Sequence, residues 1–529
     1  MTPAIQSVVT AHTPESLVEQ LHGESGIVLL RSGLFDSPPA RYSFVAARPF
    51  LTFRTCGSRC ETIPHDGDGQ PQVQFGNPWR GLEALLARYE LLDEVDLPFP
   101  LGGCFGFWGY DLKEFVESKL RVHTAADLDL PDCQLGFYAS LVAFDHRLGQ
   151  AWIIATGLGT DGTRDEHRQT AQFDFWHVRL TARPNPASTT PSPDWHVCEV
   201  SSSFSRADFI AAVEAAQRYI RAGDIYQVNL AQRLSVRLNE QGEDPVVGQA
   251  SCLSSEPPEA TTPPDRQAAC PTTTGWDLFR RLADVSPAPF SAFLDCGDFQ
   301  LASSSPEQFL RLSGPHIQTR PIKGTRPRHL DPTRDAQLAY ELQTSAKEQA
   351  ELVMITDLLR NDLGRVCEFG SVQVPDLLRL EKFTHVQHLV STIEGQLRPG
   401  ITHLGALAAC FPGGSITGAP KFRAMEIIDE LEPVARGPYC GALGYLGFNR
   451  ESQWSIIIRT AICKDGVVHF PVGAGIVADS DPAAEYEETL AKAQGFFAAL
   501  ELPGAQFIRP VTGTKPSRIS HSWPEIKNP

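Results

Sequence analysis

Four glutamates stand in two pairs whose members are three residues apart: Glu348 and Glu351, and Glu485 and Glu488. The first pair lies in residues 345–362, where the apolar spacing predicts a helix. The second lies in residues 479–500, where Asp481 and Pro482 predict a helix start. Residues three apart share a helix face. Carboxylates on two such faces could hold a hard cation such as Mg²⁺, and the lack of accompanying His or Cys argues against zinc. The spacing alone equally describes two solvated helix faces.

A second group of reactive residues lies between positions 303 and 328. Strand-like runs flanking a Ser/Gly/Pro turn predict a hairpin there. Lys323 stands at the end of a strand, before Gly324 and Thr325, whose N–H and hydroxyl suit a carboxylate. A lysine in a site is an anion clamp or, when desolvated, a neutral nucleophile, and Glu307 is a candidate general acid. A plain surface lysine in a turn is the alternative.

An arginine stands in an apolar, strand-like run. The run reads IIIRTAI and its charge is Arg459. A buried arginine needs a carboxylate partner, and the sequence leaves open whether the protein or a ligand supplies it. Glycine-rich turns at 411–421 and 473–482 precede predicted helices, where exposed amides favour anions. Neither turn matches a phosphate-loop or dinucleotide motif, so nucleotide binding is not predicted.

Composition limits the function classes. The chain has 529 residues, 42% hydrophobic and 21% charged, which suits a folded protein of about two to four domains. Its formal net charge of −17 argues against a nucleic-acid partner. We see no membrane span and no signal peptide. The 12 scattered cysteines lack a CxxC pair, which indicates reduced thiols and a cytoplasmic location.

Composition shifts divide the chain into regions. Residues 1–181 mix short strands with a helical stretch. Residues 182–196 are rich in Pro, Ser and Thr and predict a linker. Residues 197–505 are expected to form the catalytic region, with a low-complexity insertion at 239–275. Residues 506–529 are expected to be a flexible tail.

Together these segments resemble the chorismate-utilising enzyme family. The matching motifs, in the family's order, are YQVNLAQR (226–233), SSSPEQFL (303–310), RPIKGTRPR (320–328), MITDLLRNDLGRV (354–366), VQHLVSTIEG (386–395), PGGSITGAPK (412–421), GYLGF (444–448), IRTAI (458–462) and GAGIVADSDPAAEYEET (473–489). The resemblance implies an α/β (α+β) fold in which two large antiparallel-rich sheets pack as a sandwich with helices outside. Residues 1–181 more weakly resemble the N-terminal region of anthranilate synthase component I and its para-aminobenzoate relatives.

The resemblance also implies a cofactor and a substrate. Glu351 and Glu488 would bind Mg²⁺, with Glu348 and Glu485 supporting through water, and the metal would hold the ring carboxylate of chorismate. Glu307 would protonate the departing C4 hydroxyl. His388 matches a histidine near the ring.

Further residues are implied to contact chorismate. Gly324 and Thr325 would lie near the ring carboxylate. The residues assigned to the enolpyruvyl carboxylate are Tyr445, Arg459 and the amides of Gly473, Ala474 and Gly475.

Two positions favour one branch of the family. Water-adding members carry a lysine where this chain has Gln227, so water addition is disfavoured. Anthranilate-forming members usually read PIAGT, whereas residues 321–325 read PIKGT. That pattern resembles members that make 4-amino-4-deoxychorismate for para-aminobenzoate and folate, in which the lysine, here Lys323, attacks C2. Anthranilate formation is the alternative, and a non-catalytic sensor of aromatic ligands is a remote one.

The same resemblance implies partners. We recognise no glutaminase segment, so we expect a separate glutamine amidotransferase subunit to supply ammonia. Ser32, Pro289, Phe290 and Ser291 lie in segments that resemble the tryptophan pocket of anthranilate-forming members. Arg31 replaces an acid there, so inhibition by tryptophan is not expected, while a bound structural tryptophan remains open.

Overall fold

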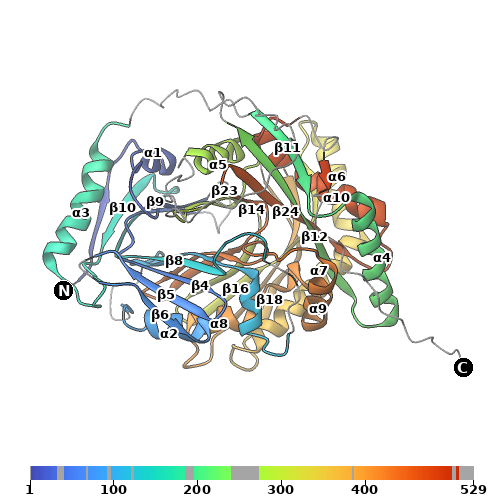
Figure 1. The fold of residues 1–529 in the computed structure, drawn as a ribbon, viewed down its shortest axis with the longest axis horizontal. Coiled ribbons are helices and arrows are strands. Elements are labelled where there is room, and N and C mark those ends of the chain that lie inside the picture. Colours follow the sequence, from blue (N-terminus) through green and yellow to red (C-terminus); the bar gives the residue numbers. More distant parts are fainter. Residues whose placement is uncertain are drawn as a thin grey trace, which may run out of the picture.

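The computed structural model describes residues 2–32, 41–66, 69–91, 97–120, 124, 126–184, 196–239, 273–383, 386–502 and 508–510. Within these residues the chain forms two large sheets that face each other, with helices on their outer sides (Figure 1). All neighbouring strands run antiparallel except one parallel pair at the edge of the first sheet. The predicted sandwich is therefore confirmed.

The first sheet has 13 strands among the described residues. In spatial order they are β1 (Ala4–Val8), β10 (Gln150–Ala155), β9 (Ser140–Asp145), β3 (Tyr42–Ala46), β2 (Val28–Arg31), β13 (Phe290–Asp295), β14 (Gln300–Ser305), β23 (Thr460–Lys464), β24 (Val467–Ile476), β12 (Gln227–Asn239), β11 (His196–Ser202) and β25 (Ile508–Pro510), with β20 (Gly418–Ala419) beside β12.

The second sheet has 12 strands in the same part of the chain. Their order is β17 (Ile322–Pro327), β19 (Val386–Gln396), β16 (His316–Arg320), β15 (Gln308–Ser313), β22 (Glu451–Ile456), β21 (Ala442–Gly447), β7 (Gly103–Trp108), β8 (Cys133–Tyr138), β4 (Leu51–Cys56), β5 (Arg59–Pro64) and β6 (Gln72–Phe75), with β18 (Gln373–Lys382) beside β19.

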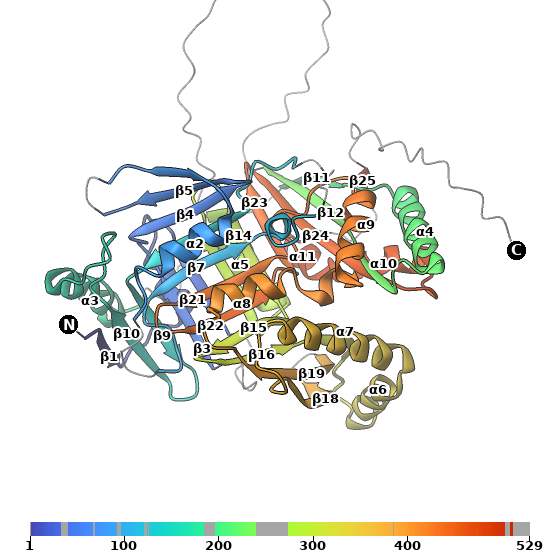
Figure 2. The same cartoon turned by 90° about the horizontal axis from the view of Figure 1, so that it is seen from below.

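Helices pack against both sheets. They are α1 (Pro14–Glu19), α2 (Pro78–Leu86), α3 (Glu166–Thr181), α4 (Arg206–Ala222), α5 (Thr273–Val285), α6 (Pro332–Thr344), α7 (Ala346–Gly364), α8 (His403–Cys410), α9 (Lys421–Leu431), α10 (Pro482–Lys492) and α11 (Gln494–Ala499). Figure 2 shows α6 and α7 gathered with β18 and β19 at the end of the molecule that lies opposite α3. No helix in the described ranges is long and apolar enough to cross a membrane.

Aromatic side chains fill the space between the sheets. Phe44 of β3 meets Tyr445 of β21 edge-on, with 5.2 Å between ring centroids. Phe107 of β7 meets Phe299, next to β14, at 5.9 Å. A second hydrophobic cluster lies on the outer face of the first sheet, beneath α4, α5 and α10. Burial on both faces explains why several strands read as continuous apolar runs.

Strands from residues 1–181 belong to both sheets. β2 pairs with β13, and β7 pairs with β21. The N-terminal strands and the later strands therefore share ladders and core. The predicted linker 182–196 and insertion 239–275 fall almost wholly outside the described residues, as does most of the tail 506–529, where β25 pairs with β11.

Sequence signals set the helices that matter for the site. Ser345 caps α7 by accepting from the Glu348 amide, and Asp481 caps α10 with Pro482 in the first turn. Ser205 begins α4, which ends at Gly223 in the left-handed conformation. Side-chain caps satisfy backbone N–H groups that the helix leaves unpaired, and the start predicted at Asp481 and Pro482 is confirmed.

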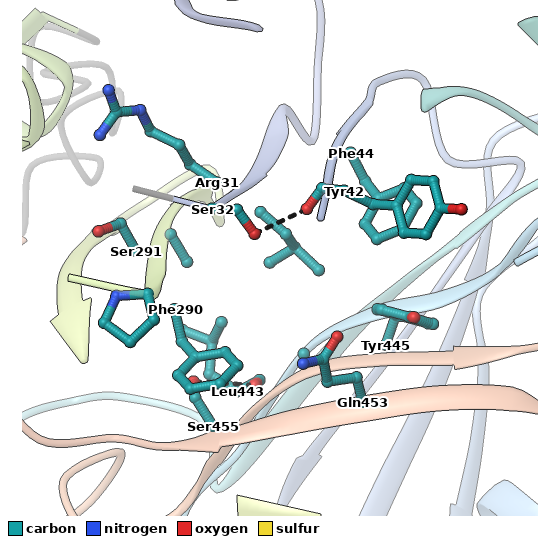
Figure 3. A pocket seen from close by; sticks show the side chains of 14 residues that line it. Arg31, Ser32, Tyr42, Phe44, Phe290, Ser291, Leu443, Tyr445, Gln453 and Ser455 are labelled. Atoms are coloured by element: carbon teal, nitrogen blue, oxygen red, sulfur yellow. Dashed lines mark hydrogen bonds between the residues drawn. The ribbon is translucent and has the colours of Figure 1, made fainter. Parts of the chain in front are cut away.

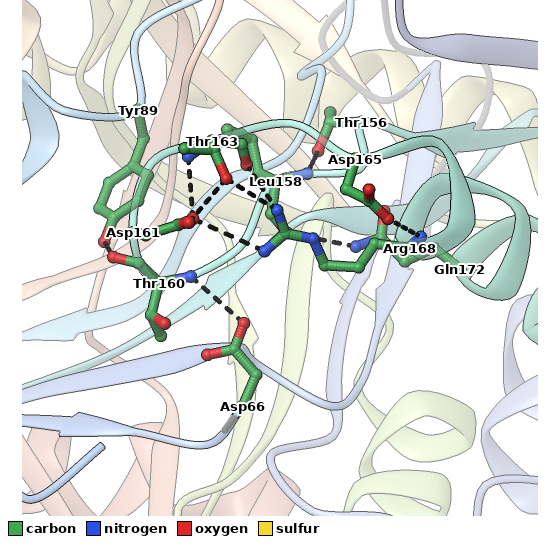
Figure 4. Close-up of polar contacts among 10 residues, drawn as sticks. All are labelled: Asp66, Tyr89, Thr156, Leu158, Thr160, Asp161, Thr163, Asp165, Arg168 and Gln172. Carbon is green, nitrogen blue, oxygen red and sulfur yellow. Dashed lines mark hydrogen bonds and ion pairs between the residues drawn. The ribbon is translucent and has the colours of Figure 1, made fainter. Parts of the chain in front are cut away.

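A polar cluster closes the connection between β10 and α3 (Figure 4). Tyr89 donates to the Thr160 carbonyl at 2.8 Å, and the Thr160 amide donates to Asp66 at 3.2 Å. Asp165 caps α3 through the Arg168 amide. These bonds tie the connection before α3 to Tyr89 and Asp66.

Candidate active site

Lys323 lies on β17 where the strand is irregular. The pairing with β19 shifts between Lys323 and Thr325, around Gly324, which has φ +68°. A side chain at Gly324 would meet Leu342 at 2.6 Å and Glu348 at 3.1 Å, so only glycine fits. The bulge turns the Lys323 amine towards α7, where Nζ lies 3.6 Å from Glu351 Oε2.

Each glutamate of α7 has a cation from the chain. Arg326 lies 3.7 Å from Glu348, and Lys347 lies 4.0 Å from Glu351. Arg326 is on the same strand as Lys323, so β17 supplies positive charge to both glutamates. The Glu348 and Glu351 side chains are therefore paired with cations and only 22% and 14% exposed.

The two glutamates of α10 have different partners. Glu488 pairs with Lys492 at 2.8 Å, while Glu485 accepts from Ser480 at 2.6 Å and has a second buried oxygen with no hydrogen-bond partner. Burial raises the pKa of Glu485, and the nearby Glu488 adds to the rise. Burial would also raise the pKa of Glu488, but the ammonium groups of Lys492 and Lys323 outweigh it and lower that pKa. Lys323 thus acts on glutamates of both helices.

The four carboxylates suit a hard cation by donor type. Mg²⁺ takes oxygen ligands, and the orphaned oxygen of Glu485 is a buried acceptor that a cation would satisfy. As they stand, no three acidic, His or Cys side chains of the described chain converge on one point. Lysines occupy the space beside Glu351 and Glu488.

Glu307 lies on the short connection between β14 and β15. Its side chain is 7% exposed, and burial raises the pKa of Glu307 to about 7. A hydrogen bond from the Ser415 hydroxyl and the charge of Lys323 limit that rise. A carboxyl with this pKa is partly protonated at neutral pH and can act as an acid.

Arg459 stands just before β23 and has a left-handed backbone, with φ +51°. Across the described residues it pairs with no carboxylate. Burial lowers the pKa of Arg459, and the neighbouring Tyr439 opposes this. The protein partner that the sequence left open is therefore absent from the described chain, and a ligand carboxylate would complete the site.

His388 connects β19 to the bulge at Gly324. Its Nδ1 lies 3.0 Å from the Thr325 hydroxyl and 3.3 Å from the Gly324 carbonyl. Burial lowers the pKa of His388, the Gly324 contact opposes this, and Arg459 adds to the lowering. His388 thus contacts the bulge that follows Lys323, and the charge of Arg459 reaches its ring.

The glycines of β24 form the floor beside Lys323. A Cβ on Gly475 would lie 2.7 Å from the Gln227 amide nitrogen and 3.7 Å from Lys323 Nζ. A Cβ on Gly473 would lie 3.0 Å from the Tyr439 hydroxyl, and the Gly473 carbonyl accepts from Lys492 at 2.8 Å. The side chains of Gln227 and Tyr439 thus approach the β24 backbone so closely that a side chain at either glycine would collide with them.

The structure does not place Tyr445 with this group. On β21, Tyr445 stacks on Phe105 and meets Phe44, in a separate pocket between the sheets. The expectation that Tyr445 lies beside Arg459 is corrected, because its position on the strand turns it away. Tyr439, which precedes the strand, lies there instead. Sequence reasoning also missed Ser415 and Lys492.

The separate pocket contains Ser32, Pro289, Phe290 and Ser291 with Tyr445 (Figure 3). Its empty volume is about 380 Å³. Ser32 donates to the Tyr42 carbonyl at 2.9 Å. Arg31 points its guanidinium away from the pocket and pairs with Glu15.

Comparison with known proteins gives the class. A family model described as chorismate binding enzyme matches residues 34–247 and 265–498. The chain therefore belongs to the chorismate-binding enzyme family and acts on chorismate.

Particular relatives are similar over nearly the whole chain. Aminodeoxychorismate synthase component 1 of Escherichia coli is 38% identical, over 90% of this chain and 93% of its own. Anthranilate synthase component 1 of Thermus thermophilus is 40% identical, over 93% and 96%. The crystal structure of anthranilate synthase component I from Streptococcus pneumoniae matches with a TM-score of 0.70 and 29% identity, over 87% of this chain and 92% of that one. Overall identity does not separate the two activities.

Proposed function

We propose that this protein is the chorismate-aminating component of an aminodeoxychorismate synthase. It would convert chorismate and ammonia to 4-amino-4-deoxychorismate and water, for para-aminobenzoate and folate synthesis. The observation that carries this proposal is Lys323, an amine at a strand bulge beside Glu351 and within reach of the Gly475 cradle. An aminating enzyme without a covalent step has no need of a lysine here.

The proposed reaction proceeds in two substitution steps through Lys323. The neutral Lys323 amine forms a bond to C2 while the ring double bond shifts and the C4–O bond breaks. Glu307 gives its proton to the leaving hydroxyl, which departs as water. Ammonia then bonds to C4, the double bond shifts back, and the C2–N bond to Lys323 breaks. Proton transfer from the incoming nitrogen restores Glu307.

Substrate binding would use the positive groups of an otherwise acidic protein. Glu351 and Glu488, with Glu348 and Glu485 behind them, would hold Mg²⁺, which when bound supplies charge for the ring carboxylate. Gly324 and Thr325 lie next to that position. Arg459 and the amides of Gly473, Ala474 and Gly475 would receive the enolpyruvyl carboxylate, with Tyr439 beside them. Gln227 offers a neutral amide and no base for water.

Ammonia would come from a glutamine amidotransferase subunit. Relatives of both activities are named component 1, which supports a two-component system. The described cysteines are free thiols, which supports a cytoplasmic location.

Anthranilate formation is the second candidate. Relatives with that name are as similar as the others, and the separate pocket with Ser32 and Phe290 is assembled. Incubation with chorismate, ammonium and Mg²⁺ followed by mass spectrometry decides between them. We expect 4-amino-4-deoxychorismate, and direct appearance of fluorescent anthranilate would reject our choice.

A further inference from the structure

A fully buried ion pair lies behind the site. Arg436, just after α9, donates to both oxygens of Glu432, from Nη2 at 2.6 Å and from Nε at 2.9 Å. The two side chains are only 3% and 5% exposed. Burial alone would lower the pKa of Arg436, but Glu432 outweighs it and raises that pKa. The charge of Glu432 therefore keeps the Arg436 guanidinium protonated despite its burial.

The ion pair hydrogen-bonds to β12, the strand next to the glycines of β24. Arg436 donates to the Asn229 carbonyl at 2.8 Å, and Glu432 accepts from the Ala231 amide at 2.9 Å. In the β12–β24 ladder, Asn229 is the partner of Gly475 and Ala231 is the partner of Gly473. The ion pair thus holds β12, the strand that pairs with Gly473 and Gly475 of β24.

The same guanidinium holds the loop that reaches Glu307. Arg436 Nη1 donates to the Ile416 carbonyl at 3.1 Å, and Asn229 donates to the same oxygen at 3.2 Å. The residue before Ile416 is Ser415, whose hydroxyl bonds Glu307.

A third contact of Arg436 is with Tyr439, the tyrosine next to Arg459. The Arg436 guanidinium lies 5.7 Å from the ring of Tyr439, which neighbours Arg459. One arginine therefore contacts three walls of the site, and a lysine lacks the planar fork needed for these bonds.

We propose that Arg436 and Glu432 are positioning residues that hold Ser415, the β24 glycines and Tyr439 in register around the substrate. A buried ion pair is weak evidence for stability, because its desolvation cost offsets its attraction. Its hydrogen bonds to the rest of the protein end on the Asn229 and Ile416 carbonyls and the Ala231 amide, which adjoin the site, while its guanidinium also lies 4.8 Å from the ring of Tyr110. This proposal depends on the proposed function because the test measures chorismate consumption.

The test is a mutant cycle between the ion pair and Ser415. Glu432→Gln with Arg436→Met removes both charges, keeps the volume and leaves an amide oxygen for Ala231. We expect this variant to melt near the wild-type temperature, since neutralising both partners leaves no unpaired buried charge. Chorismate consumption is measured with and without Ser415→Ala in each background.

In the wild-type background we expect Ser415→Ala to lower kcat about tenfold, as loss of a hydrogen bond to an ionisable group does. In the neutralised background we expect a further loss below about twofold, because Ser415 is already displaced. An equal factor in both backgrounds overturns the proposal. If the neutralised variant melts early, Arg436→Lys replaces it in the cycle, with the same expected and overturning results.

Neutralising an ion pair elsewhere, one whose arginine is partly exposed, is the control. Arg41→Met with Asp145→Asn removes the pair at the end of β9, whose atoms lie 2.6 Å apart, and should leave kcat unchanged. Wild-type protein that consumes no chorismate rejects the proposed function, whereas an active enzyme with additive losses rejects only the positioning role.

Discussion

The Nζ atom of Lys323 lies 3.6 Å from Oε2 of Glu351, so the proposed nucleophile and a proposed metal ligand form an ion pair. The charge of Lys323 also reaches Glu488 on the facing helix. A divalent cation bound by these glutamates would take over the charge that Lys323 now provides. Binding of the metal and release of the amine are then linked.

This linkage predicts that Lys323→Met strengthens metal binding. Removing one positive charge near Glu351 should favour Mg²⁺ by about 1 kcal/mol or more, or about fivefold in Kd. Calorimetric titration without chorismate measures this directly. Lys347→Met is the matched control, because Lys347 is farther from the same carboxylate, at 4.0 Å, and more exposed, so its effect should be smaller. Weaker binding by the Lys323 variant would contradict the linkage.

The raised pKa of Glu307 predicts that the rate of chorismate consumption depends on pH. The acid must be protonated to assist departure of the C4 hydroxyl, and its pKa is about 7. Chorismate consumption at saturation should therefore fall as pH rises through about 7. Glu307→Gln should lower kcat by about 10²–10⁴-fold and abolish this pH dependence. A pH dependence that persists in this variant would belong to another group.

Arg459 should serve the substrate more than the fold. No described carboxylate pairs with it, so Arg459→Met leaves no buried charge behind. We expect an unchanged or higher melting temperature and a chorismate Kd raised by about 10-fold to 150-fold, from lost charge-assisted bonds. A structural salt bridge would behave differently, since breaking one costs about 3–5 kcal/mol of stability.

Tryptophan should not inhibit turnover. Arg31 turns away from the pocket that holds Ser32 and Phe290 and pairs with Glu15. No acid from that position is available for an amino group. Initial rates with added L-tryptophan should match those without it, and a saturable loss of rate would show that the pocket regulates the enzyme.

Local features of the site were readable from the sequence. Apolar periodicity indicated the helix that holds Glu348 and Glu351, Asp481 and Pro482 indicated the start of α10, and three-residue spacing set the shared faces of the glutamates. These are short-range effects. That the two faces meet around Lys323 depends on sheet topology, which spacing does not encode.

Other site residues carry no local signal. Tyr439 and Tyr445 are six positions apart in one segment, and only strand pairing shows which of them lies near Arg459. Lys492 looks like an ordinary helix-end lysine, and Ser415 like an ordinary turn serine. Their roles arise from long-range contacts.

The central claim is that Lys323 bonds covalently to the substrate. Enzyme incubated with chorismate and Mg²⁺ but no ammonia, quenched and digested, should yield a Lys323 peptide heavier by chorismate less one water. The adduct should disappear when ammonium is added and should be absent from Lys323→Ala. An active enzyme that aminates C4 at full rate after this substitution, with no adduct on Lys323 in the wild type, would contradict the account.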